Sequence, residues 1–349
     1  YLDSNHLIPS DDVDWVDEIL RAAVVQSYNL SFTKADKKSN QLFSLGYYDQ
    51  QGLVKFSDFK RVSGRFNSEY KLFDDHLRIG ENISLSHSWG TSVSNNAALG
   101  GTLYEAYKFQ SITPVKNLED EYAGNVFSDI PNPMGKLYRN KDNQDKKSRL
   151  VGNLYAELHL FDGLMFKTSF GVDYNNLYRR SFSPKYDELN ASEKLSSLSN
   201  RNAWNFNWVF TNTLTYNKTF GDHTINALLG MESLRNRYEY FTASRDGFPS
   251  DDPNFRFLDA GDVGTQKNSG AATEYSMVSY FGKLDYNYHD RYLVAFTLRR
   301  DGSSRLGNNK WGNFPAASVG WRISNEPFFD VEAISNLKVR VGWGQNGNS

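Results

Sequence analysis

Apolar and polar side chains alternate along this chain over unusually long stretches. A clear example is LMFKTSFGVDYN, residues 164–175, in which Phe166 and Phe170 occupy one set of alternate positions and Lys167 and Asp173 the other. Successive side chains of a β-strand point to opposite faces, so the pattern predicts strands with one apolar and one polar face. Strands in soluble domains usually span about 5–6 residues, whereas a strand that crosses a bilayer needs about 9–11. The repeated length therefore favours a transmembrane β-barrel.

Composition agrees with a barrel and excludes several other classes. The chain has 349 residues with 39 basic and 41 acidic side chains, so it carries no excess of charge for binding nucleic acid. It has no cysteine, which excludes disulfides, Cys-ligated zinc and a thiol nucleophile. Aromatic residues make up 15%, yet the mean hydropathy is -0.62. A wall with one face in lipid and the other in a polar lumen accounts for both values.

Alternation and turn residues together predict a transmembrane antiparallel β-barrel wall of about twelve strands. Short turns alternate with longer connections, which is typical of outer-membrane barrels with short periplasmic turns and long extracellular loops. The two longest loops are expected at about 92–147 and 243–274. The predicted strands are 24–33, 41–49, 59–73, 77–91, 148–161, 164–179, 202–220, 224–242, 275–289, 291–300, 315–324 and 336–345.

The polar positions of these strands are expected to face the lumen. Glu81 breaks the pattern, because it shares its set of alternate positions with the apolar Ile79 and Ile83. Either it lies near the periplasmic rim, or a bulge reverses the direction of its side chain. The charged residues predicted to face the lumen are Arg61, Arg65, Lys167, Asp173, Lys283, Asp285, Lys338 and Arg340.

Several motifs, in order along nearly the whole chain, resemble the SusC/RagA-type TonB-linked outer-membrane transporters of Bacteroidetes. As a set they are specific, although each alone is weak. They are DWVDEI at 14–19, QSYNLS at 26–31, SLGYYDQQG at 44–52, RRDGSSR at 299–305, NFP at 313–315, SVGWRISNEPFF at 318–329, ISNLKVR at 334–340 and GQNGN at 344–348.

This resemblance implies a barrel of about twenty-two strands around a plug, with residues 1–349 forming part of the barrel domain. It implies TonB-dependent import of oligosaccharides or peptides across the outer membrane, energised by the TonB–ExbB–ExbD complex. A SusD-like surface lipoprotein would act as a lid. The carboxypeptidase-like extension, the plug with its TonB box and the closing C-terminal strands of the family are expected to be missing. Two other readings are a passive porin or structural barrel and a secreted β-rich sugar-binding module.

Aromatic side chains in the two longest loops are candidates for contact with a substrate or a lid, because rings give large contact areas at small entropic cost. The alternative is that they pack the loops together. The candidates are Tyr104, Tyr107, Phe109, Tyr122, Phe248 and Phe255, with Phe127 and Phe257 beside them.

No motif predicts an enzyme, a cofactor or a metal site. The stretch Gly342–Gly347 matches GxGxxG, but it ends a predicted strand and opens no helix, as dinucleotide binding would require. The acids around Asp14 lack the spacing of a calcium loop and fit the start of a short helix. Six scattered histidines, at positions 6, 76, 87, 159, 223 and 289, show no metal-ligand spacing.

Overall fold

The computed structural model describes residues 12–93 and 101–347. Within these residues, twelve antiparallel strands form one sheet in which each strand pairs with its neighbours along the chain. The predicted all-β antiparallel architecture is therefore confirmed. The strands are β1 (Val25–Ala35), β2 (Ser39–Gln51), β3 (Asp58–Leu72), β4 (Leu77–Gly90), β5 (Gln144–Phe161), β6 (Leu164–Ser183), β9 (Ser197–Phe220), β10 (His223–Asp246), β11 (Lys267–Tyr288), β12 (Tyr292–Ser303), β13 (Trp311–Arg322) and β14 (Lys338–Gly344).

The remaining elements lie in the connections. A small hairpin joins β6 to β9, and helices lie before β1 and between β4 and β5. None of the helices in the part of the chain that the structure describes is long and apolar enough to span a membrane. These elements are α1 (Trp15–Ile19), α2 (Thr102–Lys108), α3 (Pro133–Asn140), β7 (Tyr186–Glu188), β8 (Ala191–Glu193), η3 (Pro253–Phe255), η4 (Leu258–Ala260), η5 (Val263–Thr265) and η6 (Ile323–Asn325).

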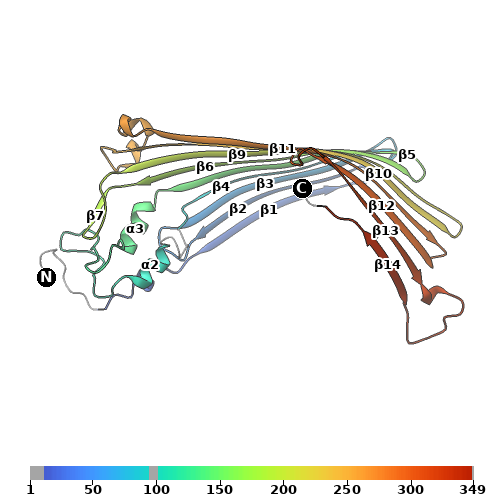
Figure 1. Ribbon diagram of the computed structural model, residues 1–349, viewed down its shortest axis with the longest axis horizontal. Helices are drawn as coiled ribbons and strands as arrows, with labels where there is room; N and C mark the ends of the chain where they lie inside the picture. The colour runs from blue at the N-terminus through green and yellow to red at the C-terminus, as the bar shows by residue number, and fades with distance from the viewer. Residues whose placement is uncertain (1–11, 94–100, 348–349) are drawn as a thin grey trace.

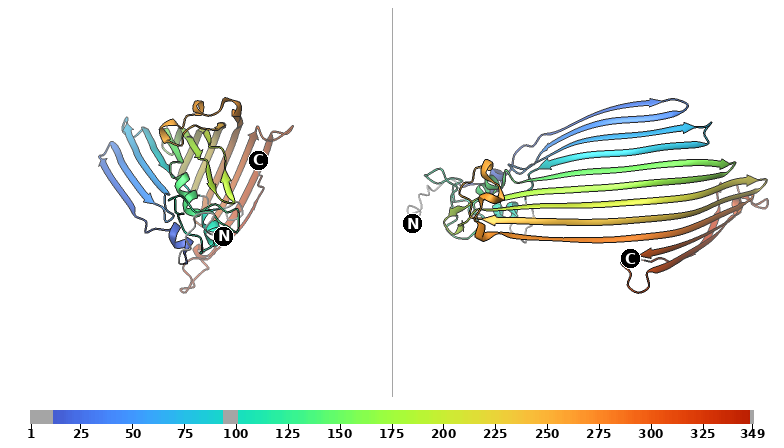
Figure 2. Two further views of the ribbon diagram at one scale, coloured as in Figure 1. Left: turned by 90° about the vertical axis from the view of Figure 1, so that its left-hand side faces the viewer. Right: turned by 90° about the horizontal axis from the view of Figure 1, so that it is seen from above.

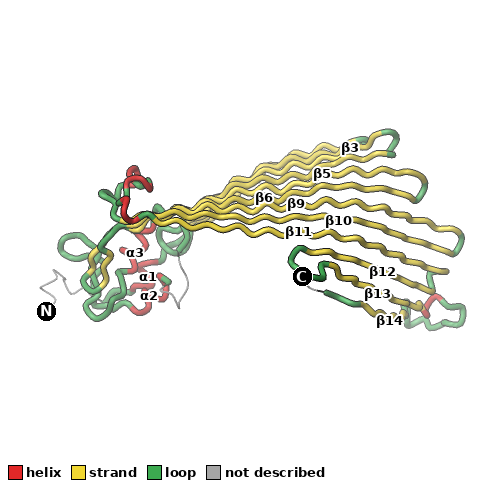
Figure 3. Tube along the Cα trace, turned by 45° about the horizontal axis from the view of Figure 1, so that its top comes forward, coloured by secondary structure: helices red, strands yellow, loops and turns green. Residues whose placement is uncertain are grey.

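The sheet is long and curved (Figure 1). Viewed along the strands, it forms an arc whose concave side holds the helices, while the connection between β10 and β11 lies on the convex side (Figure 2). The helices α1, α2 and α3 and the connection between β10 and β11 gather at one end of the sheet, which we call the long-loop end (Figure 3). The opposite, short-turn end carries tight turns such as those at 73–76, 162–163 and 221–222, and also the longer connection 323–337.

The register of the strands separates the sheet into two faces. Paired residues of an antiparallel ladder lie on the same face, and Leu214 of β9 pairs with Phe166 of β6 and Leu229 of β10. The same apolar row continues through Leu298 and Pro315. The intervening residues form a polar face, so the alternation in the sequence becomes one apolar and one polar surface. Toward the long-loop end the apolar surface also carries charges, such as the ion pairs of Arg235 and Arg237 with Glu274.

The polar face is the concave one. Asp145 and Arg179 belong to the polar face and line a pocket together with Lys136 of α3, which lies on the concave side. Phe182 and Leu198 belong to the other face, and they pack against Phe248 of the convex loop. The curvature of the sheet and the burial of Phe182 and Leu198 therefore both indicate that the polar face is concave and the apolar face is convex.

Several strands extend further than the alternation predicts. β9 and β10 each have 24 residues, about twice the number needed to cross a bilayer. The additional residues, among them 197–201 and 243–246, lie at the long-loop end. The excess length would carry these strands beyond the lipid, where polar groups can occupy both faces.

The tight turns depend on residues that tolerate positive φ. Gly163, in the turn between β5 and β6, has φ +87°, and a Cβ there would lie 2.4 Å from the backbone oxygen of Asn217. Its neighbour Asp162 completes a two-residue hairpin connection, for which Asp-Gly is a favoured sequence. The turn thus fixes the register between β5 and β6.

Glu81 lies on the apolar face, and β4 pairs with both neighbours without a register shift at this position. The bulge explanation is therefore wrong. Apolar Ile79 and Ile83 flank Glu81 along β4, which begins at Leu77, so a position near the periplasmic rim stays a prediction. Its carboxylate accepts a hydrogen bond from the Ser68 hydroxyl on β3. This bond supplies one polar partner on a surface that otherwise offers few.

We expect Leu214→Arg to lower the free energy of unfolding in lipid by about 2–4 kcal/mol, the cost of Arg on the lipid face near mid-bilayer. Leu214 lies roughly 15 Å from the short-turn end, given the rise and tilt of a barrel strand. Urea-induced unfolding in lipid vesicles measures the change. Thr213→Arg, one residue away on the polar face and near Glu232, is the control. Equal losses in the two variants would contradict the assignment of the faces.

The pair Ser68→Ala and Glu81→Leu should stabilise the protein in lipid by about 1 kcal/mol, because an acid on the lipid face costs less than Arg or Lys but still costs free energy. The same unfolding assay applies. Glu69→Leu is the matched control, since Glu69 lies on the polar face and accepts a hydrogen bond from the Tyr155 hydroxyl at 2.8 Å. A destabilised Ser68→Ala/Glu81→Leu protein would show that Glu81 does not meet lipid.

Candidate functional site

All the charged residues that the sequence places on the polar positions of the strands share the concave face. Arg61 and Arg65 lie on β3, opposite Ser88 and Ser84 of β4. The others lie on strands distant from β3, so the structure spreads these residues over the face and does not gather them into one site. That the face lines a lumen stays a prediction. The other residues are Lys167 and Asp173 of β6, Lys283 and Asp285 of β11, and Lys338 and Arg340 of β14.

Many charges of the concave face are paired across neighbouring strands. Lys167 Nζ lies 2.9 Å from Glu157 Oε1, and Arg149 makes two bonds of 3.0 and 2.8 Å to the carboxylate of Asp173. Such bidentate pairs fix both side chains against the wall. Part of the charge on the concave surface is thus neutralised by pairing, whereas Arg61, Arg65, Lys338 and Arg340 have no ion pair among the described residues.

The mouth of the arc at the long-loop end is occupied by a small apolar core. Trp15 of α1 packs edge-on against Phe109 at a centroid distance of 4.7 Å, and both rings are almost fully buried with Leu137 of α3. Asp14 begins α1 by accepting hydrogen bonds from the backbone N–H groups of residues 16 and 17. The expected helix start at these acids is confirmed.

A buried carboxylate joins two loops beside this core. Glu188 of β7 is 3% exposed and accepts hydrogen bonds from the backbone N–H of Asn132 and from Arg139 of α3. Burial raises the pKa of Glu188, and the neighbouring Arg139 guanidinium opposes that rise. The guanidinium also lies 3.8 Å from the ring centroid of Tyr186. This cluster holds the connection between β4 and β5 against the β7–β8 hairpin.

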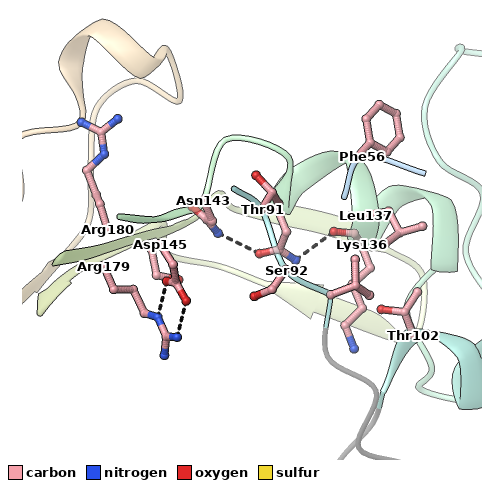
Figure 4. A pocket seen from close by; sticks show the side chains of 13 residues that line it. Phe56, Thr91, Ser92, Thr102, Lys136, Leu137, Asn143, Asp145, Arg179 and Arg180 are labelled. Carbon is pink, nitrogen blue, oxygen red and sulfur yellow. Dashed lines mark hydrogen bonds and ion pairs between the residues drawn. The ribbon is translucent and has the colours of Figure 1, made fainter. Parts of the chain in front are cut away.

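Several cavities adjoin the loops, and two of them are lined in part by α3. One, of about 320 Å³, lies between α3 and the ends of β5 and β6, where Arg179 forms a bidentate ion pair with Asp145 (Figure 4). The other, of about 780 Å³, opens between the loops and lies within the size range of ligand sites. Its lining combines rings with charges of both signs, a chemistry suited to binding. Among the lining residues are Tyr122, Tyr138, Tyr186, Arg139, Lys141, Arg256, Asp142 and Asp251.

The aromatic residues predicted to contact a substrate or lid fall into three environments. Phe109 and Phe248 are 5% and 7% exposed and pack within separate loop cores. Tyr122 packs against the first core and lines the larger cavity. The outward-facing rings are Tyr104, Tyr107 and Phe255, with Phe127 and Phe257, all between 40% and 73% exposed. Contact of any of them with a substrate stays a prediction.

Sequence reasoning missed the other rings and the cations of the larger cavity. Tyr138 and Arg139 lie on α3, and Tyr186 lies on β7. Both elements fall in stretches that the sequence marks only as connections. The sole signal was the alternation of tyrosine with basic residues in LYRNK at 137–141, which is too common to single out.

The motifs that the sequence discounts show no chemical site in the described ranges. Gly342 and Gly344 belong to the end of β14, and no helix occurs in 345–347. Within residues 12–93 and 101–347, no group of three or more His, Asp or Glu side chains is arranged to hold a metal ion. His6 lies outside the described residues, as does Asp11.

Comparison with known proteins shows which proteins the chain resembles. No family model matches the chain. The chain is 30% identical over 99% of its length to TonB-dependent receptor P3 of Formosa agariphila, and 29% identical over 97% to TonB-dependent receptor SusC of Bacteroides thetaiotaomicron. It covers 35% and 36% of these two proteins, so it spans about a third of the length of the curated relatives it matches.

Solved structures show the same fold. The RagAB peptide importer in its closed-closed state aligns with 98% of this chain and 39% of its own, with a TM-score of 0.84 and 24% identity. The ferripyoverdine receptor of the outer membrane of Pseudomonas aeruginosa aligns with 86% of this chain and 38% of its own, with a TM-score of 0.53 and 11% identity. The chain is therefore similar in sequence to TonB-dependent receptors of the SusC/RagA type and has the fold of part of an outer-membrane β-barrel.

Proposed function

We propose that the protein works in TonB-dependent import of oligosaccharides or peptides across the outer membrane, and that the concave face of this chain lines the import path. The observation that carries the proposal is the division of the curved sheet into a convex apolar face and a concave polar face. A barrel wall in lipid needs this division, because the outside meets hydrocarbon and the inside meets water. TonB dependence rests on the likeness to the receptors named above.

Exposed apolar side chains in the loops favour a partner protein at the long-loop end of the barrel. Apolar side chains exposed at the long-loop end lie at the same end as the expected lid, and exposed apolar patches commonly mark interaction sites. We infer that a SusD-like lipoprotein covers them and captures substrate between itself and the barrel, while the TonB–ExbB–ExbD complex supplies energy through a plug. The exposed residues include Leu53, Tyr107, Leu118, Phe127, Phe255 and Phe257.

Uptake by cells tests the import. Cells that make the protein that contains this chain should take up labelled oligosaccharides or peptides at a saturable rate, and deletion of tonB should abolish that uptake. The matched measurement uses the same cells without the protein. Uptake that persists without TonB and rises linearly with concentration would instead identify a passive porin.

Replacing Tyr107 and Phe127 by Ser should weaken binding of the lid lipoprotein about tenfold, because exposed aromatic side chains are common hot spots of interfaces. Surface binding assays with the purified lipoprotein give the dissociation constant. Phe73→Ser is the control, since this ring is also highly exposed but lies in the turn between β3 and β4 at the opposite end. An unchanged dissociation constant in the double variant would remove these rings from the interface.

A further inference from the structure

Four asparagine side chains form a contiguous patch on the concave face, which we call the asparagine patch. It consists of Asn175 of β6, Asn205 and Asn207 of β9, and Asn236 of β10. Asn175 pairs with Asn205, and Asn207 pairs with Asn236, so the four amides occupy two adjacent rows of three neighbouring strands. Side chains in such positions lie about 5 Å apart across strands and about 7 Å apart along them.

Two of these amides are not held by the fold. Asn236 Nδ2 donates to Asn205 Oδ1 at 2.9 Å, but the buried Oδ1 atoms of Asn175 and Asn207 accept no hydrogen bond from the described residues. A buried acceptor without a donor costs free energy. Rotation of the terminal amide exchanges oxygen and nitrogen at little steric cost. Asn175 and Asn207 can therefore turn either a donor or an acceptor toward the concave side.

The groups around the asparagine patch are held by other side chains of the wall, although Arg201 has no carboxylate partner among the described residues. Its guanidinium donates to Thr242 and Tyr238 and lies 4.0 Å from the ring centroid of Tyr240. Asp173, next to Asn175 along the same face of β6, is held by both bonds from Arg149. Tyr238, opposite Asn205, accepts a hydrogen bond of 3.1 Å from Arg201 and lies 6.0 Å from the ring of Tyr240. The asparagine patch thus offers neutral donors and acceptors beside two tyrosine rings.

The asparagine patch lies farther from the short-turn end than the apolar band of a barrel extends. Asn207 lies roughly 30 Å above the short-turn end of β9, given the rise and tilt of a barrel strand, and the apolar band of a barrel is about 25 Å tall. The amides therefore face the outer half of the concave space, between the loop-covered mouth and the membrane-embedded wall. A solute that entered at the long-loop end would pass them.

We propose that the asparagine patch is a binding site for an oligosaccharide segment on its way through the barrel; this inference rests on the proposed import function. Hydroxyl groups both donate and accept, as side-chain amides do, and a sugar ring presents several in two dimensions, like the two rows of amides. Tyr238 would lie against an apolar face of the sugar ring, since the ring of Tyr240 already carries the Arg201 guanidinium. A peptide fits less well, because its amides follow one line and do not match two adjacent rows of amides.

Structure determination with a probe tests the site directly. The protein that contains this chain, purified in detergent, is imaged by cryo-electron microscopy with millimolar maltoheptaose and, separately, with an uncharged heptapeptide. Sugar density within hydrogen-bond distance of Asn175 and Asn207 supports the proposal. Water alone, a protein segment seated on the amides, or density for the peptide in place of the sugar overturns it.

A variant gives an independent readout. Asn175→Leu together with Asn207→Leu removes two amides at similar side-chain volume, and should weaken maltoheptaose binding in calorimetry about tenfold, as expected for two net hydrogen bonds. Asn82→Leu, on the same face of β4 and outside the asparagine patch, should leave binding unchanged. Equal affinities for the double variant and the unaltered protein would overturn the site.

The experiments can overturn the asparagine patch and the proposed import function independently of each other. Loss of maltoheptaose binding in the double variant, with uptake of other cargo still dependent on TonB, supports both proposals. Intact TonB-dependent uptake with unaltered sugar binding in the variant overturns the asparagine patch alone. Sugar bound at the asparagine patch in a protein whose uptake ignores TonB would overturn the import mechanism alone.

Discussion

The antiparallel hydrogen-bond ladder is the interaction on which the rest of this structure depends. In lipid no water can satisfy a backbone N–H or C=O group, so each strand must pair with neighbours along its length. The ladder also forces successive side chains to opposite faces. One register therefore decides that Leu214, Phe166 and Leu229 form an apolar surface and that Lys167 and Asp173 do not. Fold, membrane contact and proposed path all follow from that division.

The loops add packed segments on both sides of the sheet at the long-loop end. At the long-loop end the strands continue past the length a bilayer requires, and the connections fold onto both sides of them. Trp15 and Phe109 form a core on the concave side, whereas Phe248 packs on the convex side. The mouth is thereby narrowed by ordered segments joined through Glu188 and Arg139. A lid and a ligand would meet these segments before they meet the wall.

The sequence predicted the wall well where one face must meet lipid. The alternation at 164–175 placed β6, but β9 was predicted to start at residue 202 and not at Ser197, because residues 197–201 show no apolar period. Loop packing could not be predicted, since the burial of Phe109 depends on a partner far away in sequence. The asparagine patch needs the register itself: Asn175 and Asn207 look like ordinary strand residues until β6 and β9 are aligned.

The most direct test of the account is which face of the sheet meets lipid. The chain has no cysteine, so single cysteines at successive positions 209–214 of β9 each introduce the only thiol of this chain. In outer-membrane vesicles, the account predicts that thiols at Val209, Thr211 and Thr213 react with a water-soluble maleimide. A lipid-soluble quencher should reach labels only at Phe210, Asn212 and Leu214. Uniform or reversed labelling would contradict the assignment of the convex face to lipid and of the concave face to water.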